Sequence, residues 1–437
     1  MNYAINWDAG GSAQIELSAP REGEKDAEAS FQMKFISPFR QAVRPSPIDI
    51  NLDPEDVRPI NEDLQRLNGL AIAPRGAAAP NEAANPAIEL CESIGDMMYR
   101  LVIPNDIHGE LASEDVLLDF VIDESLIKFP WELMHDGEDF LSLKYGMGRF
   151  VNNASKGAIS PAAPLPPFSA GPLSVLLISV PQPIERDGKT FAKLDAAEAE
   201  TKAIAAELIK LRPDIQLETM TGNDSTFDGV RNRLRNGRRA HIVHFNGHAE
   251  FDPERPRSSA LVLQDKNMTM AFLKAFFGQK PPALFFMNAC ETAATPADAG
   301  AGANLNPNHV FGLARPFLET GAYLIGTRWK VGDQGAKAFA AAFYSQLKEG
   351  KPLGKMIRDA RRACRDPNCP DDLTWASYVY YGDPRLCFRK VPQVQAEPVP
   401  AEGSAAQVAE PAQAAEQAPV AALPPLPELP AQHPAGG

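Results

Sequence analysis

Two stretches decide the fold of this sequence: AHIVHFNGHAEFDPE at residues 240–254 and PPALFFMNACETAA at residues 281–294. Each contains a short apolar run that ends in a small polar cluster. Apolar runs of this length, bounded by turn residues, predict buried strands of a parallel sheet. Because chemistry collects beyond the carboxyl ends of such strands, His248 and Cys290 are expected to be neighbours in space. A thiolate nucleophile and its base require this arrangement.

The bulk composition is that of a globular protein with more than one domain. The chain has 437 residues, of which 44% are hydrophobic and 23% are charged, so it can bury a large core. The net charge of −13 argues against nucleic acid or an anionic membrane as partner. Five irregularly spaced cysteines fit a reducing compartment better than a disulfide framework. Without a signal peptide or an apolar run of membrane-spanning length, the expected location is cytoplasmic.

Residues 1–155 are interpreted as a separate α+β accessory domain. Segments with alternating apolar and polar residues, such as Ala13–Leu17, predict half-buried strands, and Ala87–Arg100 has helical spacing. Within the segment VIDESLIKFPWEL, Trp131 is interpreted as a core or inter-domain anchor. The dipeptide Asp136-Gly137 predicts a tight turn.

The remainder is divided into a Pro/Ala-rich linker (156–172), a domain (173–390) and a Pro/Ala-rich acidic tail (391–437) that is expected to be disordered. In the domain, strands alternate with helices, which predicts a parallel-rich α/β sheet flanked by helices. The expected strands are Leu173–Val180, Ile215–Met220, His241–Phe245, Ala260–Leu263, Ala283–Met287, Ala322–Thr327 and Ala376–Tyr381. The expected helices are Leu194–Leu211, one capped by Ser225 or Thr226 that ends near Arg235, Thr269–Phe277, His309–Thr320, Gly335–Lys348 and Leu353–Cys364.

Neither a metal nor another cofactor is expected. His241, His244 and His248 suggest a metal site, but at strand spacing His241 and His244 point to opposite faces of a sheet, so these two cannot share one. No carboxylate or cysteine stands at ligand spacing, and no glycine-rich nucleotide loop follows any strand.

The residue types of Cys290 and His248 leave two interpretations open for each. A buried cysteine often acts only as a small hydrophobe. At a strand end it instead faces a cleft, where nearby backbone N–H groups favour the thiolate. His248 is either a proton carrier near neutral pH or a strand-end histidine bonded to a backbone carbonyl.

Several motifs together resemble the CHAT domain, a caspase-like (clan CD) cysteine peptidase module. Within residues 173–388 they are HFNGHAEFDPE, SSALVLQD, ALFFMNACETA, GLARPFLETGAYLIGTRWKVGD and YVYYGDP, in this order. The segment VIDESLIKFPWEL also looks like the region that often precedes bacterial CHAT domains. Asn288-Ala289-Cys290 and the upstream histidine echo the caspase signature without matching it letter for letter.

The resemblance implies a caspase-like fold with Cys290 as nucleophile and His248 as general base and acid. It implies an oxyanion hole made by the backbone N–H groups of Ala249 and Cys290. Asn288 is expected to face the substrate pocket, with Trp329 on its rim. The chain departs from the usual pattern at Ala249, where caspase-like sites carry glycine, and a positive φ at this position would strain an alanine.

The function expected from this resemblance is that of an endopeptidase that cleaves specific protein substrates. The resemblance further implies that it stays latent until a regulatory protein partner activates it, in a bacterial defence or cell-death system. The alternative is a catalytically silent CHAT-like scaffold whose accessory domain and tail bind partners. The sequence leaves the substrate and the oligomeric state open.

Overall fold

The computed structural model of the chain describes a defined set of residues. Residues 1–393 form one compact unit, and residues 394–437 form a second. The second unit lies outside the described set, so the predicted disorder of the tail is not tested. Most of the expected linker and of the expected helix His309–Thr320 lies outside it as well. The described residues are 2–7, 12–18, 30–36, 48–51, 58–60, 62–64, 66–67, 86–105, 116–123, 126–127, 129–153, 157–158, 168, 171–250, 252, 255, 258–278, 280–291, 315, 317–329, 331, 333–365 and 373–391.

Strands and helices alternate along most of the described chain. The strands are β1 (Asn2–Trp7), β2 (Ser12–Ser18), β3 (Ser30–Ile36), β4 (Ile48–Asn51), β5 (Leu117–Asp123), β6 (Gly146–Asn153), β7 (Gly157–Ala158), β8 (Leu173–Ser179), β9 (Ile184–Arg186), β10 (Lys189–Phe191), β11 (Ile215–Met220), β12 (Ile242–Glu250), β13 (Ala260–Val262), β14 (Asn267–Thr269), β15 (Leu284–Glu291), β16 (Tyr323–Thr327), β17 (Tyr378–Tyr381) and β18 (Leu386–Val391). The helices are α2 (Pro86–Val102), α3 (Leu141–Lys144), α4 (Asp195–Ile209), α5 (Phe227–Asn236), α6 (Met270–Phe277), α8 (Asp333–Ser345), α9 (Leu353–Cys364) and α10 (Thr374–Ser377), with 3-10 turns η3 (Trp131–Leu133), η4 (Gly222–Ser225) and η7 (Leu347–Glu349).

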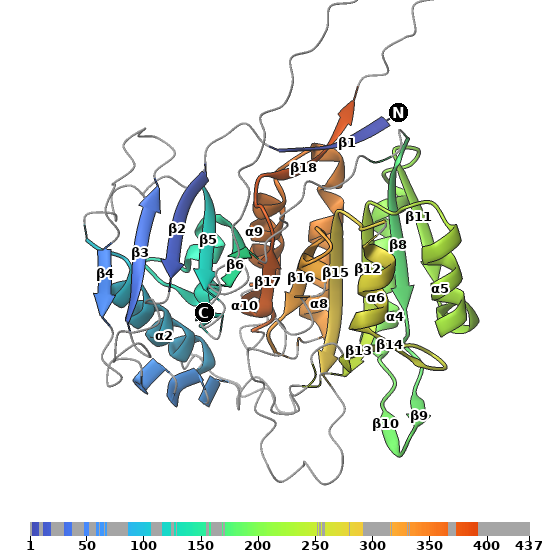
Figure 1. The fold of residues 1–437 in the computed structure, drawn as a ribbon, viewed down its shortest axis with the longest axis horizontal. Helices are drawn as coiled ribbons and strands as arrows, with labels where there is room; N and C mark the ends of the chain where they lie inside the picture. Colours follow the sequence, from blue (N-terminus) through green and yellow to red (C-terminus); the bar gives the residue numbers. More distant parts are fainter. Residues whose placement is uncertain are drawn as a thin grey trace, which may run out of the picture. The chain divides into compact units, whose positions relative to one another are not determined.

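A 14-stranded mixed sheet organises the molecule (Figure 1). Its main path runs in the order β11-β8-β12-β15-β16-β17-β6-β5-β2-β3-β4. The strands from β11 to β16 are parallel to their neighbours along this path, whereas β17 is antiparallel to β16. The strands β8 and β16 are rich in apolar side chains and are buried along their whole length, as expected for a sheet covered on both faces. The parallel-rich α/β sheet predicted from the sequence is therefore confirmed.

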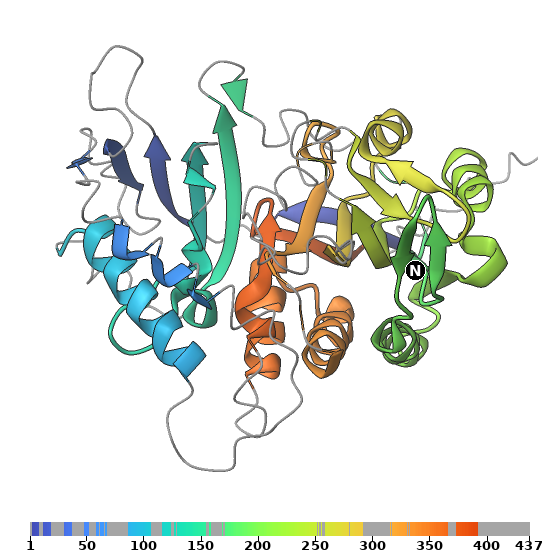
Figure 2. The same cartoon turned by 90° about the horizontal axis from the view of Figure 1, so that it is seen from below.

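Helices cover both faces of the sheet. Seen from below, α2, α9, α8 and α4 lie along one face, and α5 and α6 lie on the other (Figure 2). Thr226 and Thr269 start α5 and α6 by accepting hydrogen bonds from the backbone N–H groups of Gly229 and Phe272, each at 3.3 Å. The sequence left Ser225 and Thr226 open as the cap of α5, and the structure selects Thr226.

Two strand pairings connect the first and last parts of the chain, one within the 14-stranded sheet and one in a separate two-stranded sheet. β6 pairs with β17 in parallel at the single position Arg149↔Tyr381. β1 pairs antiparallel with β18, from Asn2↔Val391 to Trp7↔Leu386. The sheet thus continues across the domain boundary expected near residue 155, and that division into domains remains a prediction.

The two strands that carry His248 and Cys290 are longer than predicted. The sequence predicts strand ends at Phe245 and Met287, but β12 continues to Glu250 and β15 continues to Glu291. The polar clusters therefore belong to the strands. β13 supplies the physical reason for β12, because it pairs with the last two residues of that strand.

Gly247 does not make a sharp exit from the strand, although glycine is the residue best suited to one. It lies within β12, and its φ is not positive. A Cβ atom at this position would lie 2.9 Å from the Phe245 ring and 3.3 Å from Val180. Close packing against these two side chains explains the glycine.

The predictions for the segment around Trp131 are confirmed. Trp131 is buried at the start of η3, and its indole Nε1–H donates to the Leu126 carbonyl at 3.0 Å. The turn at Asp136-Gly137 is present, with Gly137 at a φ of 95° and His135 paired with Phe140. This segment therefore anchors the first part of the chain to the core.

Replacing Gly95 with alanine is expected to destabilise the fold by about 2–3 kcal/mol. Gly95 lies in α2, and a Cβ atom there would stand 1.9 Å from the backbone carbonyl oxygen of Leu133 in η3. Since a backbone oxygen cannot rotate away, helix and turn would have to separate. Ser93→Ala, at an exposed position on the same helix, serves as control in chemical denaturation. Equal stability of the two variants would contradict this packing.

None of the helices within the described ranges is both long enough and apolar enough to cross a membrane.

Candidate active site

The site forms where β12 and β15 lie side by side (Figure 1). The two strands run parallel, and their register pairs His248 with Cys290. Register partners on neighbouring strands belong to the same face of a sheet. The fold therefore places the two residues at adjacent positions, although 42 residues separate them in the sequence.

His248 is held by the short hairpin of β9 and β10, which projects beyond the carboxyl ends of the parallel strands (Figure 1). The imidazole is only 1% exposed, and its centroid lies 5.3 Å from the Phe191 ring. Its Nε2 lies 2.8 Å from the carbonyl oxygen of Ala192, just after β10. A histidine bonded to a backbone carbonyl was one of the two interpretations left open by the sequence.

This contact fixes which imidazole nitrogen carries the proton. A carbonyl oxygen can only accept a hydrogen bond, so Nε2 must donate to Ala192. In the neutral ring Nδ1 is then the basic nitrogen. The bond to Ala192 is therefore compatible with a catalytic role, because it selects the tautomer and orients the ring.

The hairpin itself is tied to the sheet by polar contacts. The Arg186 guanidinium bonds the Leu263 carbonyl at 3.3 Å and the Asn267 side chain. Lys189 forms an ion pair with Glu250 at the end of β12. The hairpin that orients His248 is thus fastened to β12 and to the β13–β14 segment.

Ala249 lies inside β12 between two paired strands. Its register partners are Glu291 on β15 and Leu261 on β13. Its φ is not positive, so the strain considered for an alanine at this position does not arise. Its backbone N–H lies in a sheet that has a paired strand on either side.

Asn288 is buried on β15, two residues before Cys290. It is the register partner of Asn246, and its side-chain amide donates to Glu200 Oε2 at 2.7 Å. Its side chain thus contacts a carboxylate on α4 inside the protein, and its expected place in a substrate pocket remains a prediction.

Trp329 follows β16 and is 4% exposed. Its indole Nε1–H donates to the Leu373 carbonyl at 3.3 Å, and its backbone N–H donates to the Ser377 hydroxyl at 3.1 Å. These bonds hold Trp329 against α10, and its role as the rim of a substrate pocket remains a prediction.

His241, just before β12, and His244 within it occupy opposite sides, as their spacing predicts. His241 stacks on Phe168, whereas His244 contacts Tyr344 and Glu200. Among the residues that the structure describes, no group of three or more His, Cys, Asp or Glu side chains could hold a metal ion.

His241 makes the stability of the fold sensitive to acid. Burial lowers the pKa of His241 to about 4, with a smaller contribution from Arg238 and Arg239. The ring accepts the Ser174 N–H at Nδ1 (3.0 Å), so a proton at this nitrogen would face a donor. An unfolded histidine titrates near 6.5, so the free energy of unfolding should fall between about pH 6.5 and pH 4, by up to ~3 kcal/mol.

Denaturation at pH 7 and pH 4.5 tests this acid sensitivity. His241→Gln keeps an acceptor for Ser174 without a titrating ring, so its loss of stability between the two pH values should be smaller than in the wild type. His135→Gln, which changes a partly exposed histidine, should retain the full loss. An unchanged loss in His241→Gln would contradict the assignment to His241.

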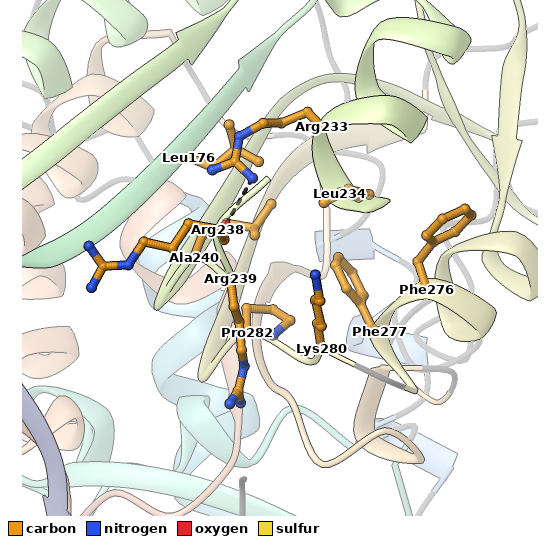
Figure 3. Close-up of a pocket in the computed structure, with 11 residues that line it drawn as sticks. Leu176, Arg233, Leu234, Arg238, Arg239, Ala240, Phe276, Phe277, Lys280 and Pro282 are labelled. Carbon is orange, nitrogen blue, oxygen red and sulfur yellow. Dashed lines mark hydrogen bonds between the residues drawn. The ribbon is translucent and has the colours of Figure 1, made fainter. Parts of the chain in front are cut away.

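A pocket at the opposite end of β12 is separate from this site (Figure 3). Its lining includes Leu176, Val243 and Phe277 together with four basic residues. Arg238 and Arg239 extend away from its centre, and Lys280 Nζ donates to the Arg235 carbonyl at 3.3 Å. Val243 precedes His248 by five residues along β12, so this pocket is not next to His248 and Cys290.

Two parts of the site were not predicted from the sequence. The β9–β10 hairpin carries a visible signal, because Asp187-Gly188 stands between two short runs with apolar ends. The other is Glu200, which falls at helical spacing with the buried residues Ala197, Ile204 and Leu208. A carboxylate on the apolar face of a helix indicates a buried polar partner.

Comparison with known proteins places this geometry in a family. A family model described as CHAT domain matches residues 92–383, and no curated protein matches the chain. The chain is similar to separase of Saccharomyces cerevisiae in its complex with securin, at 14% identity and a TM-score of 0.35, covering 76% of this chain and 23% of separase. It is similar to the Arg-specific cysteine proteinase gingipain R of Porphyromonas gingivalis (12%, TM-score 0.40, covering 77% of this chain and 76% of that one). It is also similar to the Drosophila initiator caspase Dronc (10%, TM-score 0.30, covering 49% and 81%).

The family match extends further toward the N-terminus than the motifs found in the sequence. It begins at residue 92 and so includes β5 and η3, the segment that resembles the region preceding bacterial CHAT domains. It covers more than half of the chain, including both His248 and Cys290. The chain belongs to the CHAT-domain family and has the parallel-rich α/β architecture expected from its sequence.

Proposed function

We propose that this protein is a caspase-like cysteine endopeptidase that hydrolyses peptide bonds in specific protein substrates. Cys290 is the nucleophile, and His248 is the general base and acid. The observation that carries the proposal is the register pairing His248↔Cys290 on adjacent parallel strands. The bond from His248 Nε2 to Ala192 supports it, because this bond leaves Nδ1 as the nitrogen that exchanges protons.

The reaction is acyl transfer in two steps. The thiol proton of Cys290 passes to His248 Nδ1, and the sulfur attacks the carbonyl carbon of the scissile peptide bond. The C–N bond then breaks as the imidazolium returns the proton to the leaving amine. In the second step His248 takes a proton from water, the hydroxide attacks the thioester, and the carboxyl product leaves as Cys290 regains its proton.

The oxyanion of each tetrahedral intermediate needs backbone donors. We assign them to the N–H groups of Ala249 and Cys290. Because the pairing of β12 with β15 extends one residue further, to Ala249↔Glu291, both N–H groups belong to a paired region of the sheet. A substrate therefore reaches them only when the strands separate at this end.

The need to separate these strands explains how the proposed enzyme stays latent. In the closed arrangement His248, Asn288 and Trp329 are all nearly inaccessible to solvent. We propose that a regulatory protein partner opens the ends of β12 and β15, which uncovers the pair and the substrate pocket that we assign to Asn288 and Trp329. The proposed setting is a bacterial defence or cell-death system in the cytoplasm.

Digestion of a peptide library and of candidate protein substrates tests the proposal. The wild type and Cys290→Ala are compared, each alone and with candidate partners. We expect cleavage by the wild type only, with the same bond protected once Cys290 is alkylated. Equal cleavage by the two proteins would overturn the assignment of Cys290.

A catalytically silent scaffold is the second candidate function. The pairing of β12 with β15 beyond the dyad favours it, because a scaffold has no need to open there. A scaffold predicts that Cys290→Ala leaves partner binding unchanged and that the thiol has an ordinary pKa. A depressed thiol pKa would speak against it.

A further inference from the structure

A buried polar cluster lies directly beneath the proposed catalytic pair. Two residues before His248 and Cys290, their strands carry Asn246 and Asn288, which are again register partners. Side chains two residues apart on a strand belong to the same face, so this pair forms the next layer below the catalytic level.

Glu200 joins the two strands at this layer. It comes from α4 and is 2% exposed. Its Oε2 accepts the side-chain amides of both Asn246, at 3.1 Å, and Asn288, at 2.7 Å. One carboxylate oxygen thus bridges β12 and β15 about 7 Å, or two residues, below the catalytic level.

The second oxygen of Glu200 faces His244. Oε1 lies 3.4 Å from His244 Nε2, and neither atom has another hydrogen-bond partner. His244 is fully buried, and its Nδ1 lies 3.0 Å from the Tyr344 hydroxyl. A hydrogen on Nε2 would satisfy both atoms at once, because His244 could then donate to Glu200.

We propose that Glu200 is a positioning residue for the Cys290–His248 pair. It holds the two strands together below the pair, and its negative charge raises the pH at which the pair titrates. The inference rests on the proposed function. The titratable groups whose contacts reach this cluster are His244 on β12, Tyr344 on α8 and Tyr378 on β17, with Cys290 and His248 above it on the strands.

The sign of the electrostatic effect follows from the charge. A carboxylate two strand residues, or about 7 Å, below the pair stabilises the imidazolium form of His248 and disfavours the thiolate form of Cys290. Both effects raise a pKa, so removing the charge moves the whole pH profile toward lower pH. With an intermediate effective dielectric constant at this distance, the expected shift is about one pH unit.

Glu200→Gln tests the charge because it preserves shape. The glutamine oxygen can accept from both asparagines, and its NH2 group can donate to His244 Nε2. We expect the pH midpoint for alkylation of Cys290, and the acid limb of kcat/KM, to fall by about one pH unit. Glu198→Gln, an exposed glutamate on the same helix, removes the same charge and should leave both profiles in place.

Asn246→Ser tests the bridge, since it removes one tie and leaves the charge. We expect kcat/KM to fall about tenfold with an unchanged pH midpoint. A pH profile of Glu200→Gln that coincides with the wild type, together with wild-type kcat/KM in Asn246→Ser, would overturn the inference. If Glu200→Gln does not fold, wild-type kcat/KM in Asn246→Ser overturns it alone.

The outcome for Cys290→Ala separates this inference from the proposed function. If Cys290→Ala cleaves as well as the wild type, the proposed function itself fails. If Cys290→Ala is inactive while Glu200→Gln and Asn246→Ser behave as the wild type, only the role of Glu200 fails.

Discussion

Replacing Glu132 with glutamine is expected to destabilise the protein by about 3–5 kcal/mol. Glu132 is 1% exposed in η3 and forms a bidentate ion pair with Arg149 on β6, which is equally buried. Two further buried arginines, Arg328 and Arg361, feel the charge of Glu132. Without this carboxylate three guanidinium groups would share one low-dielectric region, and each would lose its attraction to Glu132.

Arg361 shows how much the cluster depends on Glu132. It is fully buried, and its described hydrogen bond is the one from Nη2 to the Tyr378 carbonyl at 2.8 Å. Burial lowers the pKa of Arg361 to about 10, and the charge of Glu132 opposes this fall. Since Arg149 also forms the pairing of β6 with β17, loss of Glu132 should weaken the junction between the two parts of the sheet.

Chemical denaturation of Glu132→Gln and of the control Glu138→Gln measures this effect. Glu138 is 85% exposed in the same segment, so its replacement should change the free energy of unfolding by less than about 1 kcal/mol. A loss in Glu132→Gln no larger than in the control would contradict the claim that the buried carboxylate compensates the three arginines.

Replacing His248 with alanine is expected to lower kcat/KM for peptide cleavage by about a thousandfold or more. In the proposed mechanism, the variant lacks the nitrogen that accepts the thiol proton and the group that protonates the leaving amine. It also leaves the Ala192 carbonyl without its donor, so the fold of the variant has to be checked by its melting temperature.

His248→Gln provides the matched variant, since its amide can still donate to Ala192 but cannot exchange a proton. We expect it to be as inactive as His248→Ala and to be more stable. The partly exposed His135→Gln should retain wild-type cleavage. A His248→Gln protein with activity within about tenfold of the wild type would contradict the general-base role.

The central sheet could be predicted from the sequence because its strands are continuous apolar runs. Leu173–Val180 and Ala322–Thr327 match β8 and β16 to within one residue, and Leu353–Cys364 matches α9. The ends of β12 and β15 could not be predicted, because Asn246-Gly247-His248 resembles a turn. The pairing with β15, which is distant along the chain, carries β12 through these residues, and β13 pairs with its last two residues.

The sequence predicts that His248 and Cys290 are neighbours, because each follows an apolar strand. The residues that surround them could not be predicted. The bond from His248 Nε2 to the Ala192 carbonyl depends on a hairpin whose strands have three residues each, too short for a periodic pattern. Glu200 lies 44 residues before His244, and no local pattern links the two. The strands β1 and β18 pair although almost the whole chain separates them in sequence, and neither strand carries a pattern that reveals its partner.

The most direct test of the Cys290–His248 pair is the rate of Cys290 alkylation as a function of pH. The modified peptide is quantified by mass spectrometry, so that the other four cysteines do not contribute. In the wild type the midpoint should lie below the value of about 8.5 for an ordinary thiol, and in His248→Ala it should rise toward that value. Coincident profiles with a midpoint near 8.5 in both proteins would contradict the pairing.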